Sequence, residues 1–98
     1  MNTPITDWRG KRVWLLGASS GIGAALARAL LREGARVAVS ARSAAKLEAV
    51  VRDRPDGLVL PCDAADPASI AAAWQSLLHH WQGVDLAIYI AGDYVPMR

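Results

Sequence analysis

The feature that most constrains the fold of this chain is a glycine-containing segment between an apolar run and a helix-forming stretch. Val13–Leu16 is short and apolar, the sequence GASSGIG follows at positions 17–23, and a helical pattern begins near Gly21. A strand that passes directly into a helix is typical of a β-α-β unit, whose second strand lies parallel to the first. The segment therefore predicts an α/β domain.

Three further apolar segments continue this alternation of strand and helix. They are Arg36–Ser40, Leu58–Leu60 and Leu86–Ile90. None of them alternates polar and apolar residues, which is typical of strands covered on both faces of a parallel sheet. We therefore expect the order β-α-β-α-β-α-β, with right-handed crossovers between the strands.

The first two helical patterns have recognisable ends. The first begins near Gly21 and ends at Gly34, because glycine readily adopts the left-handed conformation that closes a helix. The second follows Ser43, a residue type that caps helix N-termini well, and stops before Pro55. We expect these two helices to cover one face of the sheet.

The third helical pattern has the clearest start, with Asp66 as N-cap and Pro67 at the first helical position. Gly83 closes it. Its apolar residues recur at helical spacing: Ile70, Ala73, Trp74, Leu77, Leu78 and Trp81. We expect this helix alone to cover the second face of the sheet.

Composition excludes several classes of protein. The 98 residues, of which 53% are hydrophobic and 20% charged, are typical of one small globular domain. The net charge of +2 comes from dispersed arginines, without the basic block of a nucleic-acid-binding tail. No apolar run reaches the roughly 18 residues of a membrane span, and no signal peptide is recognisable. The single cysteine, Cys62, excludes an internal disulfide and fits the reducing environment of the cytoplasm. Together these observations lead us to expect a cytoplasmic protein that binds neither nucleic acid nor membranes.

The glycine-containing segment has the chemistry of a pyrophosphate site. The free N–H groups at a helix start, with the positive end of the helix dipole, attract a diphosphate. Gly17 can turn with positive φ, Gly21 lets phosphates approach the backbone, and Gly23 lets the helix pack closely on the sheet. Ser19 and Ser20 add hydroxyl donors. The alternative is a tight turn that binds nothing.

The G-x-x-x-G-x-G spacing of GASSGIG resembles the short-chain dehydrogenase/reductase family. The resemblance assigns Gly17, Ser19, Gly21, Ile22 and Gly23 to the pyrophosphate. It also implies a Rossmann-type sheet of strand order 3-2-1-4, with the cofactor bound where that order reverses.

The segment VAVSARS at positions 37–43 is similar to the end of the family's second strand. In that family an acidic residue there selects NAD by holding the ribose 2′-hydroxyl. Here Ala41 occupies the acidic place and Arg42 follows it, which is the family's pattern for NADP. A guanidinium pairs with a 2′-phosphate, whereas a carboxylate repels it. The resemblance therefore implies NADP in preference to NAD; the alternative is a solvated arginine near a helix start.

Two later segments also match the family. CDAAD at 62–66 resembles the stretch that binds adenine, which assigns that role to Asp63; helix capping or simple solvation is the alternative. VDLAIYIAGDY at 84–94 resembles the fourth strand and the Asn-Ala-Gly loop beside the cofactor. Ala91 and Gly92 match this loop, and the resemblance places them beside the ribose of the cofactor. Ile90 stands where the family has asparagine.

The resemblance runs from about Trp8 to Arg98 and covers only the first half of the family's domain, so the sheet is expected to be incomplete. Residues 1–7 are expected to be loosely ordered, and 8–98 to form the N-terminal part of an NAD(P)-binding Rossmann domain. The family's catalytic serine and Tyr-x-x-x-Lys pair lie beyond these residues. We therefore predict no catalytic residue and no metal site here, and expect the 98 residues alone to be inactive.

Three functions remain open at this stage. The first is the NADP-binding N-terminal segment of an oxidoreductase that transfers hydride between nicotinamide and a small carbonyl or alcohol substrate. The second is a sensor that binds NADP without catalysis, which the unusual Ile90 favours. The third is an assembly module in which Leu86–Ile90, as an open apolar edge, pairs with another chain. That edge leads us to expect a homo-oligomer.

Overall fold

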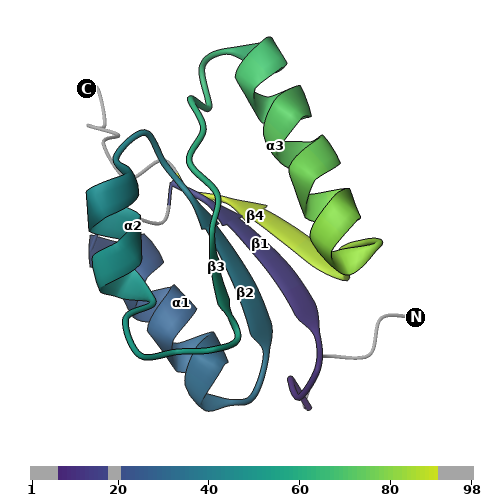
Figure 1. Cartoon of the computed structure of the whole chain (residues 1–98). Coiled ribbons are helices and arrows are strands. Elements are labelled where there is room, and N and C mark those ends of the chain that lie inside the picture. The colour runs from purple at the N-terminus through teal and green to yellow at the C-terminus, as the bar shows by residue number, and fades with distance from the viewer. Residues whose placement is uncertain (1–6, 18–20, 91–98) are drawn as a thin grey trace, which may run out of the picture.

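The four apolar segments form one parallel sheet whose strand order is β3-β2-β1-β4, as the sequence predicts (Figure 1). A computed structural model describes residues 7–17 and 21–90. The strands are β1 (Arg12–Leu16), β2 (Arg36–Ser40), β3 (Gly57–Val59) and β4 (Leu86–Tyr89). β1 pairs in parallel with both β2 and β4, and β2 pairs with β3. The predicted α/β, Rossmann-type topology is therefore confirmed.

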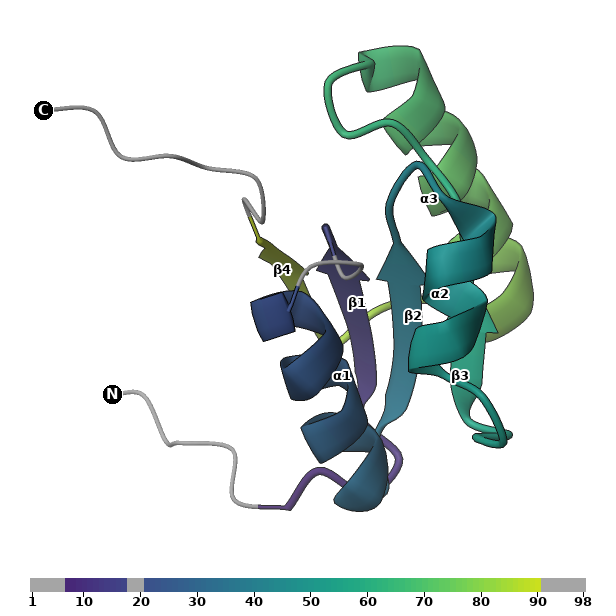
Figure 2. The same ribbon diagram turned by 90° about the vertical axis from the view of Figure 1, so that its left-hand side faces the viewer.

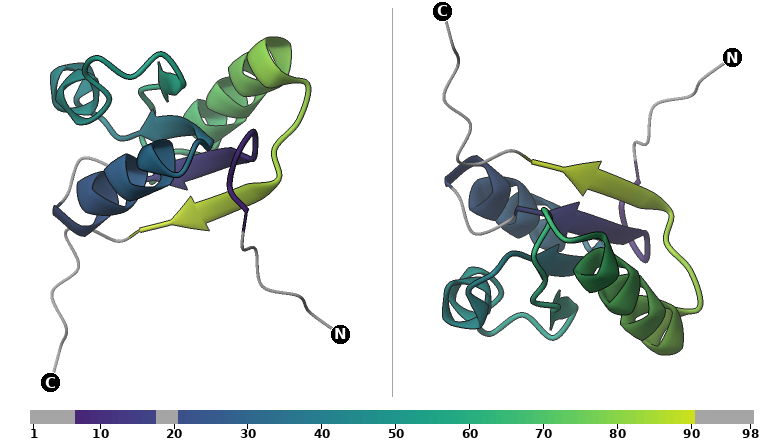
Figure 3. Two further views of the ribbon diagram at one scale, coloured as in Figure 1. Left: turned by 90° about the horizontal axis from the view of Figure 1, so that it is seen from below. Right: turned by 90° about the horizontal axis from the view of Figure 1, so that it is seen from above.

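Helices cover the sheet on both faces. They are α1 (Gly21–Arg32), α2 (Ala44–Val50) and α3 (Pro67–Trp81). α1 and α2 lie on one face and α3 on the other, which the end-on views of Figure 3 show most directly. Within the described part of the chain, no helix combines the length and apolarity needed to cross a membrane.

The helix starts follow the predicted capping signals. The side chain of Ser43 accepts a hydrogen bond from the N–H of Lys46, and that of Asp66 accepts one from the N–H of Ala68, with Pro67 as the first helical residue. These bonds satisfy backbone donors that lack partners inside the helix.

The helix ends agree with the sequence in one case and correct it in another. α1 ends as predicted, with Gly34 at φ +91° and the N–H of Ala35 donating to the carbonyl of Leu30. α3 ends differently, because Gln82, at φ +62°, takes the left-handed position that we assigned to Gly83. The N–H of Gln82 bonds the carbonyl of Leu78, and Gly83 lies one residue further on.

Two hydrophobic clusters, one on each face, explain why β1 and β2 do not alternate in polarity. The α1 and α2 face buries Val13, Leu15, Val37 and Val39, among others. The α3 face buries Trp14, Ala38, Leu60, Cys62, Ala73, Leu77 and Trp81. Trp14 also stacks on Trp74 of α3, with ring centroids 5.8 Å apart. Successive strand residues therefore point into different clusters, and residues 13–15 of β1 and 37–40 of β2 are buried.

β4 differs from the two central strands, because its residues alternate between half-buried and exposed. Leu86 and Ile88 pack on the α1 and α2 face, whereas Ala87 and Tyr89 are exposed, Tyr89 by 66%. The prediction of a strand covered on both faces is therefore wrong for β4. The physical reason is that the buried cluster under α3 is drawn from β1, β2 and the segment after β3.

The strand ends deviate from the predictions by one residue. β3 begins at Gly57 rather than Leu58, because Val37 of β2 pairs with Gly57, and β4 ends at Tyr89 rather than Ile90. The hydrogen bonding continues beyond these ends, since the N–H of Leu60 donates to Val39 and that of Ile90 to Leu16. The predicted loose order of residues 1–6 lies outside the described residues.

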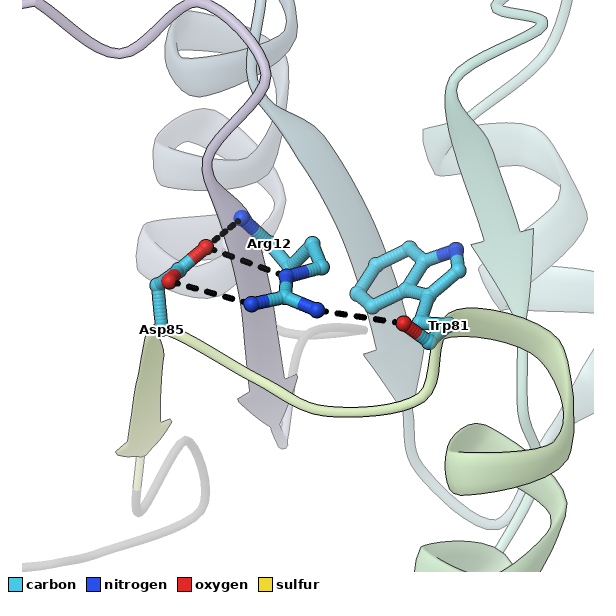
Figure 4. A network of polar contacts seen from close by, with 3 residues as sticks. All are labelled: Arg12, Trp81 and Asp85. Atoms are coloured by element: carbon cyan, nitrogen blue, oxygen red, sulfur yellow. Dashed lines mark hydrogen bonds and ion pairs between the residues drawn. The ribbon is translucent and has the colours of Figure 1, made fainter.

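A polar network fixes the start of β4 against β1 (Figure 4). Asp85 accepts from the backbone N–H of Arg12 at 2.8 Å and from its guanidinium Nε at 3.2 Å and Nη2 at 3.3 Å. Nη1 of Arg12 donates to the carbonyl of Trp81, the last residue of α3, at 3.1 Å. One arginine thus connects β1, α3 and β4, and the hydrogen bonds from Arg12 lower the pKa of Asp85.

This network predicts a pH dependence of stability. Because the pKa of Asp85 is lower in the folded than in the unfolded protein, its contribution is complete above the unfolded value of about 3.9 and is lost as pH falls through the folded pKa. Urea unfolding between pH 2.5 and 7 should therefore show the free energy of unfolding falling in acid. In Asp85→Asn, this free energy should be lower at neutral pH and its fall in acid shallower.

Asp7→Asn is the matched control. Hydrogen bonds from Arg9 also lower the pKa of Asp7, but the two residues are neighbours in sequence and both side chains are mostly exposed. Such a local pair contributes little to folding. A pH profile of Asp85→Asn parallel to that of the wild type would contradict the prediction.

Candidate functional site

The four strands are parallel, so their carboxyl ends lie along one edge of the sheet (Figure 2). Among the predicted site residues that the structure describes, Gly17, Arg42 and Asp63 follow the ends of β1, β2 and β3 in the chain. Leu16, the last residue of β1, pairs with Ser40 at the end of β2 and with Tyr89 at the end of β4. The strand ends that Gly17, Arg42 and Ile90 follow are therefore neighbours in the sheet. The strand order reverses between β1 and β4, which is where ligands of open α/β sheets bind.

Gly17 adopts the conformation that its place in the motif predicts. Its φ is +88°, and its N–H donates to the carbonyl of Ser40 at 2.6 Å. A β-carbon at this position would overlap the carbonyl oxygen of Ile90. The turn is therefore fixed by β2 on one side and by the chain after β4 on the other, and only glycine fits it without strain.

The start of α1 is open at one glycine and closed at another. Among residues 7–17 and 21–90, nothing lies within 4 Å of a β-carbon built on Gly21, so these residues leave room for a ligand there. Gly23 is buried, as expected of a residue where the helix packs against the sheet. Ile22 is 77% exposed at the helix start. Ser19 and Ser20, also assigned to this site, lie outside the described residues.

Arg42 lies two residues beyond the end of β2, next to the N-cap of α2, and is exposed. The ion pairs within residues 7–17 and 21–90 are Arg9–Asp7 and Arg12–Asp85, so Arg42 has no acidic partner there. A cation that is not engaged in the described part of the fold can pair with an anionic ligand. The preceding residue, Ala41, adds no negative charge.

Asp63 lies at the same edge, in the segment between β3 and α3. Its Oδ1 accepts from the N–H of Ala65 at 3.0 Å, and its own N–H donates to Oγ of Ser69 in the first turn of α3 at 2.8 Å. The carboxylate of Asp63 thus closes a local turn, whereas the N-cap of α3 is Asp66. A carboxylate has two oxygens and about four acceptor positions, so this local bond leaves capacity for a ligand donor.

The chain after β4 carries the one departure from the expected motif. Ile90 takes the place of an asparagine, but its N–H still donates to the carbonyl of Leu16 at 2.7 Å. Its partly buried side chain packs against the cluster under α1 and α2. The backbone and apolar packing therefore hold this position without a side-chain amide. Ala91 and Gly92, which follow, lie outside the described residues.

One residue at this edge was not singled out from the sequence. Ser40 is fully buried at the end of β2, and it is the one buried polar residue in the part of the chain that the structure describes. Its Oγ accepts from Nε1 of Trp14 at 2.8 Å, while its carbonyl binds Gly17. The available signal was a hydroxyl that follows three apolar residues of the strand, two positions before Arg42.

Comparisons with known proteins agree with this geometry. Residues 11–97 match the family described as short chain dehydrogenase. The mouse dehydrogenase/reductase SDR family member 7 is 36% identical to this chain over 88% of the chain and 30% of its own length. Chicken D-erythrulose reductase is 36% identical over 93% of the chain and 31% of its length. The chain thus spans about a third of the length of these curated relatives.

Solved structures show the same fold with two different cofactors. L-sorbose reductase from Gluconobacter frateurii, complexed with NADPH and L-sorbose, superposes with a TM-score of 0.77 at 29% identity, over 89% of this chain and 36% of its own. A 3-ketoacyl-(acyl-carrier-protein) reductase from Brucella melitensis, complexed with NADH, gives 0.76 at 29% identity, over 81% and 33%. Similarity to these structures therefore supports a nicotinamide cofactor without deciding between NAD and NADP.

The two glycines at the turn and the helix start predict opposite effects on stability. Gly17→Ala should lower the free energy of unfolding by more than about 1 kcal/mol, because it combines a positive φ with a backbone overlap. Gly21→Ala should leave it unchanged or raise it by up to about 1 kcal/mol, because alanine favours a helix and the space is open. Urea unfolding followed by tryptophan fluorescence measures both. Equal losses in the two variants would show that the turn is not the constrained position.

Proposed function

Because this chain belongs to the short-chain dehydrogenase/reductase family, we propose that it provides the NADP-binding N-terminal segment of an oxidoreductase. The parent reaction is hydride transfer between nicotinamide and a carbonyl or alcohol substrate. The observation that carries the proposal is the glycine turn at Gly17, which is fixed between two strand ends and precedes a helix start where none of the described residues crowds Gly21.

The pyrophosphate of the cofactor is assigned to the start of α1. A helix of 12 residues presents the positive end of its dipole there, and Gly21 adds no β-carbon that would keep a phosphate away. In this proposal Gly17, Gly21, Ile22 and Gly23 form the backbone surface against which the pyrophosphate lies. Ser19 and Ser20 add hydroxyl donors.

The adenosine half is assigned to the ends of β2 and β3. Arg42 would bind the 2′-phosphate of NADP, and its exposed, unpaired guanidinium within the described residues supports this role. Asp63 would accept a hydrogen bond from the adenine amino group. Ala91 and Gly92 would border the ribose. These assignments follow the family's motif, and Ala41 in the acidic place favours NADP over NAD.

The cofactor, when bound, supplies the hydride chemistry, while this segment binds and orients it. The names of two relatives, D-erythrulose reductase and L-sorbose reductase, are those of enzymes acting on small hydroxy ketones. This supports a small carbonyl or alcohol as substrate of the whole protein. We place the catalytic serine and Tyr-x-x-x-Lys pair outside the 98 residues, so the segment alone is expected to bind without catalysis.

Two alternatives retain specific support. Ile90 in place of asparagine favours a sensor that binds NADP without catalysis. Tyr89, exposed by 66% on the edge strand β4, favours an assembly module that pairs with a second copy.

Turnover by the full-length protein separates the enzyme from the sensor. Sedimentation of the 10.4 kDa chain with and without NADPH tests assembly.

Arg42 provides the decisive test of the cofactor. At a hundredfold excess over its dissociation constant, NADPH should stabilise the wild-type chain by about 2.7 kcal/mol, measured as a rise in melting temperature. NADH at the same concentration should give a smaller rise. A charge-assisted contact is worth roughly 1.5–3 kcal/mol, so Arg42→Ala should lose at least about tenfold in NADPH affinity while NADH affinity is retained. Arg42→Asp should favour NADH.

Arg32→Ala is the matched control, because it removes an exposed arginine from the opposite end of α1 with the same change in net charge. It should leave both affinities unchanged. Equal stabilisation of the wild type by NADH and NADPH would overturn the NADP assignment. The absence of any shift with either cofactor would overturn the proposed function itself.

A further inference from the structure

Ser40 is the point where the parts of the proposed nucleotide site meet. Its carbonyl accepts from the N–H of Gly17, at the pyrophosphate turn, and its hydroxyl accepts from Nε1 of Trp14 at 2.8 Å. Arg42 follows it by two residues. Since both the backbone and the side chain of Ser40 are engaged and the residue is 0% exposed, its position is fixed more firmly than that of any exposed loop residue.

The end of β2 also contacts the segment that carries Asp63. The N–H of Cys62 donates to the carbonyl of Ala41 at 3.0 Å. Burial raises the pKa of the Cys62 thiol, and the Ser40 side chain opposes that rise. The segments at 40–42 and 62–63 are therefore joined by a backbone hydrogen bond.

A second route joins the same two segments through α3. Trp14, which donates to Ser40, stacks on Trp74 of α3, and the first turn of α3 holds the N–H of Asp63 through Oγ of Ser69. The contacts thus run from Ser40 through Trp14 and α3 to Asp63, and return to the end of β2 through the backbone bond between Cys62 and Ala41. Loss of the Ser40 hydroxyl leaves the buried indole N–H of Trp14 without its partner and loosens the route through α3, while the backbone bond remains.

We propose that Ser40 is a positioning residue that sets the separation of Arg42 and Asp63, and thereby the affinity for the adenosine 2′-phosphate half of the cofactor. The proposal rests on the proposed function. It assigns no contact between Ser40 and the ligand, because a fully buried hydroxyl acts only through the two segments that it joins. Its backbone bond to Gly17 survives a side-chain substitution, so the pyrophosphate turn should be spared.

The test compares two probes on the 98-residue chain. Adenosine 2′,5′-bisphosphate engages the proposed adenine and 2′-phosphate positions, whereas inorganic pyrophosphate engages only the turn at Gly17. In Ser40→Ala, the dissociation constant of the bisphosphate should rise about two- to tenfold, the range of one net hydrogen bond, while that of pyrophosphate should not change. Calorimetric titration well below the melting temperature of each variant measures both constants.

Two further variants separate positioning from loss of stability. Leu30→Ala, a core truncation on the α1 face, should lower the melting temperature without changing the ratio of the two constants. In an Arg42→Ala background, Ser40→Ala should weaken the bisphosphate less than it does in the wild type, because its effect acts through the placement of Arg42. Additive losses would overturn the proposal.

If Ser40→Ala does not fold, the same two dissociation constants are measured in Trp14→Phe. It keeps the ring in the core but removes the donor to Ser40, and it should weaken the bisphosphate selectively. An unchanged ratio in whichever of the two variants folds would overturn the role of Ser40 while leaving the nucleotide site intact. If the wild-type chain does not bind the bisphosphate, the proposed adenosine site is wrong and the role of Ser40 falls with it.

Discussion

The arrangement of the site depends on a steric constraint at Gly17. At this residue the ends of three neighbouring strands come together, since Ser40 of β2 accepts its N–H and the carbonyl oxygen of Ile90 occupies the place of a side chain. A larger residue would separate β1 from the chain after β4 or change the direction in which α1 leaves the sheet. The close approach of the strand ends is therefore a consequence of one missing β-carbon.

Signals that act over a few residues predicted most of the fold. The caps at Ser43 and Asp66 and the closing turn at Gly34 are local, and the structure has all three. Gln82 was missed because the left-handed conformation is only a preference of glycine, and Gly83 stands directly beside it. The Arg12–Asp85 pair, 73 residues apart in sequence, could not be predicted, because its formation requires β1 and β4 to be adjacent first.

The same distinction explains how far the site could be predicted. The positive φ of Gly17 and the open surroundings of Gly21 follow from a local motif, and the structure agrees with both expectations. The role of Ser40 depends on Trp14 and on the segment after β3, which lie elsewhere in the sequence. A buried serine has no local signature beyond its polarity, so only the assembled sheet shows that its hydroxyl accepts from Trp14 while its carbonyl accepts from Gly17.

Fold and cofactor choice rest on different parts of the molecule. The fold is shared with solved reductases that hold NADH and with others that hold NADPH, so the fold does not discriminate between these cofactors. NADP differs from NAD by one phosphate group, and we expect a charged residue at a defined place to recognise that group. Arg42 has the charge in the proposed site, but its side chain is exposed beyond the end of β2. Its position therefore depends on how firmly that strand end is held. In this chain the end of β2 is held from within, through a buried hydroxyl, by the same core that covers the sheet.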